Sequence, residues 1–280
     1  MNNIKFPVLE VFTSIQGEGK WTGIPSIFVR VGGCNLRCVF GNSRCDTPYS
    51  SFELEKPIAD TVYGVIALVK HEFEKHPNVR HIVITGGEPM LYKEQIKVFY
   101  EAIADAYDPI LTIETNGSLP ALDIWGYDYG NEDADFNYWV DLWSISPKLS
   151  TSVDRNCKFL TKAQADDHDA KRINIDNLAS YWNTIKKVRF DQENDCYIQF
   201  KFVYSGEDSV TEIKEVMEKL AEKVDVPVEV LYEYVMLMPE GTNNEQLERI
   251  SKECADVCIR EGWQFCDRLH IRIWGDKRCV

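Results

Sequence analysis

The stretch RHIVITGG, residues 80–87, decides the fold class of this 280-residue chain. It is a short run of mostly β-branched apolar residues that stops at a pair of glycines, which is the pattern of a buried strand followed by a tight turn. A helix is predicted next, over 92–107, and then a second apolar run, ILTIET at 110–115. A strand, a helix and a strand in this order form a βαβ unit, in which the two strands are parallel.

The same alternation continues on both sides of this unit. Strands are predicted at 25–31, 80–85, 110–115, 141–146, 197–204, 228–238 and 269–274, and helices at 58–76, 92–107, 175–188, 208–223 and 244–261. About six βα units result, which are too few for a closed eight-stranded barrel. We therefore predict an α/β fold, a partial TIM-type barrel of mostly parallel strands, in one domain over residues 1–280. The acidic, aromatic and turn-rich stretch 119–140 interrupts the pattern and is interpreted as an insertion.

The composition restricts the class of protein. Hydrophobic residues make up 44% of the chain, enough for a sizeable core. The net charge of −14 argues against sequence-independent binding of nucleic acid, which needs a cationic surface. Residues 1–12 lack the pattern of a signal peptide, and no stretch has the length and apolar character of a membrane span. We expect a cytoplasmic protein with no nucleic-acid or membrane partner.

Polar or glycine-rich turns follow four of the predicted strands. They are GGEP at 86–89, ETNG at 114–117, SPK at 146–148 and MPEG at 238–241. In parallel α/β folds the carboxyl ends of the strands form the rim at which ligands bind. The four turns therefore indicate one binding site.

Three cysteines, Cys34, Cys38 and Cys45, lie close together in GGCNLRCVFGNSRC, residues 32–45. The cytosol keeps thiols reduced, so clustered cysteines there indicate a metal site or catalysis. A structural zinc site uses four ligands, whereas three thiolates can hold an iron–sulfur cluster that leaves one iron open to a substrate or cofactor. A zinc site with a distant fourth ligand, and three unrelated thiols, are the alternatives.

The order of the motifs along the chain resembles one enzyme family. The motifs are FTSIQGEGKWTGIPSIFVRVGGCNLRC, CDTPYS, ITGGEPML, IETNGSL, SISPKLS, KFVY, MPEGT and DRLHIRIWGDKRCV, which run from residue 12 to residue 280. Together they resemble the 7-carboxy-7-deazaguanine synthases of the radical S-adenosylmethionine (SAM) superfamily. The resemblance implies a radical SAM core and a lyase that converts 6-carboxy-5,6,7,8-tetrahydropterin into 7-carboxy-7-deazaguanine with loss of ammonia, in queuosine-type 7-deazapurine biosynthesis.

The resemblance also implies the cofactors, the partners and the site residues. A 4Fe-4S cluster would bind to Cys34, Cys38 and Cys45, and Mg²⁺ to Thr47. The residues implied for SAM are Gly86, Gly87, Glu88, Ser146, Pro147, Lys148 and Asp46. Those implied for the pterin are Ile15, Gln16, Gly17, Glu18, Arg30, Thr85, Arg268, His270 and Val280, with Arg30 pairing with the substrate carboxylate. The implied partners are an electron donor such as flavodoxin and a second copy of the chain in a homodimer.

The chain departs from the family pattern in a few places, which concern loop geometry rather than reaction type. The cysteine spacing is C-x3-C-x6-C, four residues longer than the usual C-x3-C-x2-C. Arg44 stands where a tryptophan is usual, Cys279 stands where a glycine is usual, and the insertion at 119–140 is long. Cys254 and Cys258 lie one turn apart on a predicted helix, and we interpret them as core residues rather than as ligands of a second cluster.

Two other functions remain open at this point. A radical SAM activase that installs a glycyl radical on a partner protein would share the cysteine loop, but it would have no use for Gln16–Gly19, Arg30 or the Arg268–His270 pair. A non-catalytic zinc or iron–sulfur protein would need the cysteines alone.

Overall fold

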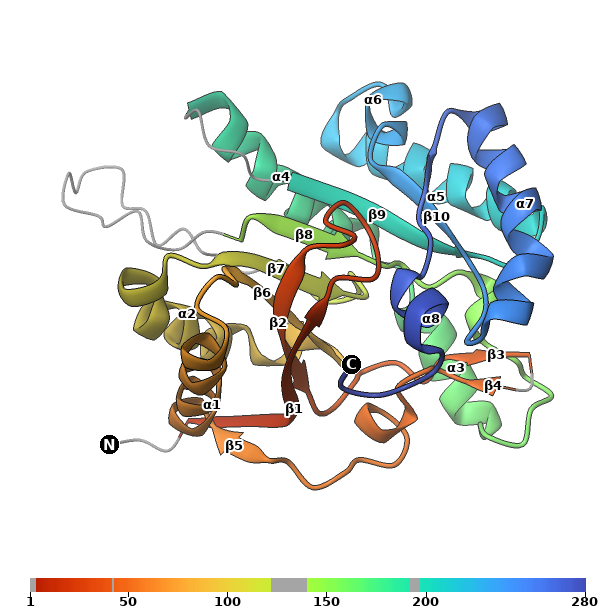
Figure 1. Ribbon diagram of the computed structural model, residues 1–280. Coiled ribbons are helices and arrows are strands. Elements are labelled where there is room, and N and C mark those ends of the chain that lie inside the picture. Colours follow the sequence, from red (N-terminus) through yellow and green to blue (C-terminus); the bar gives the residue numbers. More distant parts are fainter. Residues whose placement is uncertain (1–3, 42, 122–139, 192–196) are drawn as a thin grey trace.

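The computed structural model describes residues 4–41, 43–121, 140–191 and 197–280. Its main feature is a nine-stranded sheet in the order β11-β10-β9-β8-β7-β6-β2-β1-β5 (Figure 1). The strands are β1 (Lys5–Ile15), β2 (Pro25–Val31), β5 (Ala59–Thr61), β6 (His81–Gly86), β7 (Ile110–Thr115), β8 (Leu142–Ile145), β9 (Tyr197–Tyr204), β10 (Val235–Pro239) and β11 (Gln264–Phe265). A separate hairpin pairs β3 (Val39–Phe40) with β4 (Ser43–Arg44) inside the cysteine loop.

The middle of the sheet is parallel, as the βαβ pattern predicts. Strands β2, β6, β7, β8, β9 and β10 are each parallel to the next. Strand β1 is antiparallel to β2, and β5 is antiparallel to β1. The prediction of a partial barrel with about six parallel strands is therefore confirmed, and the sheet is open, with β5 and β11 at its edges.

Helices connect the strands along the chain, and the last helix follows β11. They are α1 (Val62–Lys75), α2 (Lys93–Tyr107), α3 (Lys162–Lys171), α4 (Ile175–Asp191), α5 (Asp208–Val224), α6 (Val228–Tyr232), α7 (Asn244–Glu261) and α8 (Leu269–Trp274). Side-chain caps fix the starts of α1, α3 and α7. The side chain of Thr61 accepts the N–H of Gly64 at 3.2 Å before α1. In Figure 1, α1, α2, α4, α5 and α7 lie around the outside, whereas α8 and the C-terminus lie between β1 and the β3–β4 hairpin.

Two strand predictions are wrong. The segment 228–238 begins as helix α6, and β10 follows it; the segment 269–274 is helix α8. Runs of five or six residues are too short for a period of 2 to be separated from a period of 3.6. The edge beside β10 is taken by β11, so the segment 269–274 has no strand beside which to pair.

The structure adds elements that the sequence analysis did not predict, namely β1, β5, β11, α3 and the β3–β4 hairpin. The predicted insertion at 119–140 lies mostly outside the described residues, since positions 122–139 are not among them. In the part of the chain that the structure describes, no helix has the length and apolar character needed to cross a membrane. The prediction of one domain over 1–280 stays a proposal; β1 and β10, from opposite ends of the chain, share one sheet, which supports it.

Asp141, just before β8, gives a test of the packing between β7 and β8. Its Oδ2 accepts the N–H of Leu111 at 2.7 Å, and burial raises the pKa of its carboxyl to about 6. The unfolded value is lower, about 3.9, so the folded state binds the proton more tightly and loses stability as the pH rises from about 4 to above 6. Asp141→Asn keeps an oxygen that can accept the N–H of Leu111. It has no carboxyl group to ionise, so this loss of stability with rising pH is removed.

We expect Asp141→Asn to be more stable than the parent by about 1 kcal/mol at pH 7.5 and to show no gain at pH 4. Urea unfolding at the two pH values measures the difference. Asp60→Asn, which removes an exposed carboxylate on β5, is the matched control. An equal change at both pH values for Asp141→Asn would contradict the expectation.

Candidate active site

A cavity of about 490 Å³ lies among the turns that follow the parallel strands. Most of the residues singled out from the sequence line it. They are Ile15, Gln16, Gly17, Glu18, Arg30, Cys34, Cys38, Cys45, Asp46, Thr47, Thr85, Gly86, Gly87, Ser146, Lys148, Arg268, His270 and Val280. The structure thus brings together residues that are up to 265 positions apart, which span both ends of the chain.

Glu88 and Pro147 are buried and do not lie among the residues that line this cavity. Glu88 is expected to lie near the amino group of SAM, but its carboxylate is fully buried behind the turn. It accepts the N–H of Met90 at 2.9 Å, where it caps a 3₁₀ turn (Pro89–Tyr92). It also accepts the hydroxyl of Thr115 at 2.6 Å and the N–H of Asn116 at 2.8 Å. A carboxylate with these bonds ties the turn after β6 to the turn after β7.

The cysteine loop and the glycine turn after β6 are in backbone contact. The N–H of Glu88 donates to the carbonyl of Gly33 at 2.8 Å, and the N–H of Gly33 donates to the carbonyl of Ser50 at 2.8 Å. A Cβ on Gly87 would lie 1.9 Å from the Gly33 oxygen. Residue 87 must therefore be glycine for the two backbones to approach this closely.

The three thiols of the cysteine loop face the same cavity and influence one another. Burial raises the pKa of Cys34 to about 11, and it raises the pKa values of Cys38 and Cys45 as well. Each thiolate would further raise the pKa of its neighbours by charge repulsion. Three thiols of this kind become thiolates together when a cation compensates their charge, which is what a bound metal does.

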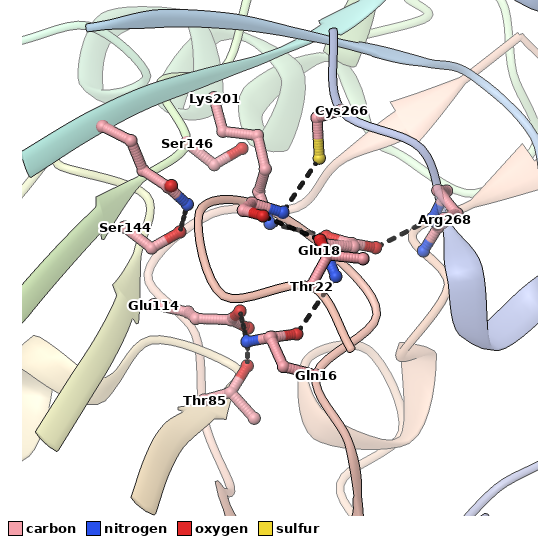
Figure 2. A network of polar contacts seen from close by, with 12 residues as sticks. Gln16, Glu18, Thr22, Thr85, Glu114, Ser144, Ser146, Lys201, Cys266 and Arg268 are labelled. Carbon is pink, nitrogen blue, oxygen red and sulfur yellow. Dashed lines mark hydrogen bonds and ion pairs between the residues drawn. The ribbon is translucent and has the colours of Figure 1, made fainter. Parts of the chain in front are cut away.

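Glu18 forms the centre of a polar network on the cavity wall (Figure 2). Its carboxylate lies 2.5 Å from Nζ of Lys201 on β9 and 2.9 Å from Nε of Arg268. Burial opposes ionisation of this carboxyl, but the two cations lower the pKa of Glu18 well below its usual value. Arg268 also lies 2.6 Å from Asp46, beside the last cysteine of the loop. The network therefore connects the β1–β2 loop, β9, the cysteine loop and the start of α8.

The start of α8 packs directly on the β1–β2 loop. The N–H of Leu269 donates to the carbonyl of Gly17 at 2.8 Å, and a Cβ on Gly17 would lie 2.0 Å from Nδ1 of His270. Burial lowers the pKa of His270 despite the nearby Glu18, so the ring is neutral at neutral pH. Residue 17 is thus a glycine because the histidine ring occupies the space of a side chain.

Gln16 and Thr85 share one carboxylate. Nε2 of Gln16 donates to Glu114 at 3.1 Å, and Oγ1 of Thr85 donates to its other oxygen at 2.7 Å (Figure 2). On the other side of the cavity, Nζ of Lys148 donates to Oγ of Ser146 at 2.8 Å. Hydrogen-bonding groups therefore face the cavity from several strand ends.

Arg30 is expected to bind a substrate carboxylate, but in the structure its Nε donates to Glu10 at 2.6 Å. Nε of Arg278 donates to the same carboxylate at 2.7 Å. Burial opposes ionisation of Glu10, but the two guanidinium groups hold its pKa below the usual range. Within the described residues, the terminal nitrogens of Arg30 have no hydrogen-bond partner, so the guanidinium keeps donors for a ligand. Val280 lies nearby and accepts the hydroxyl of Ser14.

The sequence analysis did not single out Glu10 or Lys201 as site residues, and it included Glu114 only as the first residue of the ETNG turn. Each is a charged residue in a mostly apolar strand segment: VLEVF in β1, ILTIET in β7 and YIQFKFVY in β9. A charge in a buried strand needs a partner, since an unpaired buried charge is costly. That signal was present in the sequence and could have found all three.

Comparisons with known proteins agree with this geometry. The profile of the Radical SAM superfamily matches residues 28–129. The 7-carboxy-7-deazaguanine synthase of Halobacterium salinarum is 32% identical over 275 residues, which cover 96% of this chain and 91% of that protein. The synthase of Rhodopirellula baltica is 34% identical over 273 residues, which cover 97% and 87%. This chain belongs to the 7-carboxy-7-deazaguanine synthase family. A crystal structure of QueE from Escherichia coli has the same fold, with a TM-score of 0.55 and 19% identity over 95% of each chain.

Membership of the 7-carboxy-7-deazaguanine synthase family makes the chain a radical SAM enzyme of 7-deazaguanine synthesis, with a 4Fe-4S cluster and SAM as cofactors. The cysteine loop fits such a cluster. In the described part of the chain, no three His, Cys, Asp or Glu side chains lie close enough to hold a single ion. A cubane cluster does not require this, because each of its thiolate ligands binds a different iron. Cys254 and Cys258 are buried in α7, which confirms their interpretation as core residues.

Proposed function

We propose that this enzyme converts 6-carboxy-5,6,7,8-tetrahydropterin into 7-carboxy-7-deazaguanine with loss of ammonia. The observation that supports the proposal most is that one cavity is lined by the three cysteines, by the Gly86–Gly87 turn and by the group of Glu18, Arg268 and His270. Its volume of about 490 Å³ is in the range of sites for small molecules. The proposed sites for the cluster, for SAM and for a bicyclic substrate would thereby be adjacent.

Cys34, Cys38 and Cys45 would hold the cluster, which, when reduced and bound to SAM, supplies a radical that takes a hydrogen atom from the substrate. Gly86 and Gly87 expose backbone at the cavity wall. Lys148, beside Ser146, adds a positive charge suited to the carboxylate of SAM. Asp46 lines the same cavity, where it contacts Arg268, and it would contribute to the SAM site.

Other residues would orient the pterin. The amide of Gln16 and the carboxylate of Glu114, which are hydrogen-bonded to each other, would provide a donor and acceptors for the edge of the pterin ring. Ile15, Gly17 and Thr85 would line the ring, while Glu18, Arg268 and His270 close the cavity on the α8 side. Arg30 would bind the substrate carboxylate through its terminal nitrogens, with Glu10 holding the other side of its guanidinium.

Thr47 would contribute one ligand to Mg²⁺, with water and substrate oxygens as the others. Val280 lies at the cavity near Ser14 and would contact the substrate. We also propose a one-electron donor such as flavodoxin, a homodimer and a location in the cytoplasm, as the sequence analysis expects.

The proposal is tested with anaerobically reconstituted enzyme, SAM, a reductant and the carboxypterin. We expect 7-carboxy-7-deazaguanine and ammonia in equal amounts, measured by mass spectrometry and an ammonia assay. The control omits SAM and should give no product. A sample with a full iron and sulfide content that cleaves SAM but leaves the pterin unchanged would reject the substrate assignment.

A further inference from the structure

A buried histidine outside the cavity contacts the cysteine loop. His168, on α3, is 1% exposed, and its Nδ1 accepts the backbone N–H of Arg37 at 3.1 Å. Arg37 lies between Cys34 and Cys38, and its guanidinium also donates to the carbonyl of Cys34 at 2.7 Å. Arg37 and His168 are 131 positions apart in the sequence, so a distant segment of the chain holds the backbone amide between the first two cysteines.

Ser152 determines which nitrogen of His168 carries the proton. The hydroxyl of Ser152 donates to the carbonyl of Leu149 at 2.6 Å, and its oxygen lies 2.9 Å from Nε2 of His168. Since the single hydroxyl hydrogen goes to Leu149, Nε2 must be the protonated nitrogen and must donate to Ser152. Nδ1 then has a lone pair for Arg37. Burial lowers the pKa of His168 to about 4, which keeps the ring neutral at neutral pH.

The same short segment also holds the turn after β8. Arg172, at the C-terminal end of α3, donates to the carbonyl of Lys148 at 3.1 Å and contacts Glu212 at 2.5 Å. Glu212 in turn accepts the N–H of Ser150. One helix thus contacts both the cysteine loop and the turn that carries Ser146 and Lys148.

We infer that His168 is a positioning residue, which fixes the backbone between Cys34 and Cys38 and so sets how these two thiols face the cluster. The inference rests on the proposed role of the cysteine loop as cluster ligand. The contact itself joins only the side chain of His168 and the backbone of Arg37, so it can be tested separately from that role.

The test compares His168→Phe, which keeps a ring but has no acceptor, with His168→Asn, whose side-chain oxygen can take the place of Nδ1. Amide hydrogen exchange of the metal-free, full-length protein is followed at the Arg37 amide by mass spectrometry of overlapping peptides. We expect exchange there to be about 10-fold faster or more in His168→Phe, largely restored in His168→Asn, and unchanged in β6 and β7. Asp167→Asn, on the exposed side of α3, is the matched control.

Reconstituted protein gives a second readout. We expect His168→Phe to release iron to a chelator about 10-fold faster than the parent, and His168→Asn to be close to the parent. Unchanged exchange at Arg37 in His168→Phe, or equal exchange in the Phe and Asn variants, overturns the inference. If His168→Phe does not fold, Ser152→Ala tests the inference instead. It frees the imidazole to adopt the other tautomer, so unchanged exchange at Arg37 in that variant also overturns it. None of these results depends on which substrate the enzyme uses.

Discussion

Replacing Cys45 with alanine should leave a folded protein that binds no intact cluster and forms product at least about 1,000-fold more slowly than the parent. Cys45 is the cysteine that the longer C-x3-C-x6-C spacing moves along the chain. The β3–β4 hairpin accommodates the extra residues, and the N–H of Cys45 donates to the carbonyl of Cys38 at 3.0 Å. The hairpin therefore returns the third cysteine to the first two, and all three line the cavity.

Iron and sulfide content, the absorption of the reconstituted protein and product formation measure this effect. Circular dichroism shows whether the metal-free variant is folded. Cys157→Ala removes a buried thiol that is not among the residues lining the cavity, and it should keep both cluster and activity. A Cys45→Ala protein with a normal cluster and normal turnover would show that the longer loop does not use its last cysteine.

The second large effect is expected for Gly87→Ala, where a single methyl group should lower activity by about 100-fold or more. The new Cβ would lie 1.9 Å from the Gly33 oxygen and 2.9 Å from the Ser50 oxygen, both of which are backbone atoms. Backbone cannot rotate away as a side chain can, so the cysteine loop must move. The hydrogen bond from Glu88 to Gly33 then lengthens or breaks, and the loop shifts relative to the turn after β6.

Gly32→Ala is the matched control, one residue away from Gly33. A Cβ there would meet Cδ2 of Leu9 at 3.2 Å and Cδ1 of Leu54 at 3.5 Å, which are ends of flexible side chains. We expect this variant to keep most of the activity. Steady-state rates and cluster content are measured for both variants. Equal activity in Gly87→Ala and the parent would contradict the prediction and would mean that the loop tolerates a displacement of this size.

The sequence predicted the parallel part of the fold well because buried parallel strands and amphipathic helices have a strong periodic pattern. It missed α3, where polar contacts decide the structure. Helix α3, KAQADDHDAK, has little apolar surface, and its buried residues are Ala165 and His168. The contacts that hold it, such as that of His168 with Arg37, are polar and leave no periodic pattern in the sequence.

The site was predicted in outline for a different reason. Glycines, cysteines and polar turns at strand ends can be read directly from the sequence, and the structure places most of them around one cavity. The partners of Arg30 and Glu18 could not be read in this way. Arg30 meets Glu10 and Glu18 meets Lys201 because β1 lies beside β2 and the β1–β2 loop reaches β9, and both facts follow from the tertiary fold.

The hydrogen bond from Gly33 to Ser50 bears on how the enzyme matures. It closes the segment that holds all three cysteines through backbone contacts alone, and the bond from Glu88 then fastens that segment to the sheet. Small zinc domains, by contrast, are unfolded until the ion arrives. Because the polypeptide itself makes these bonds, we expect the cysteine segment to stay attached to the sheet before iron and sulfide bind, so that assembly of the cluster can follow folding of the chain.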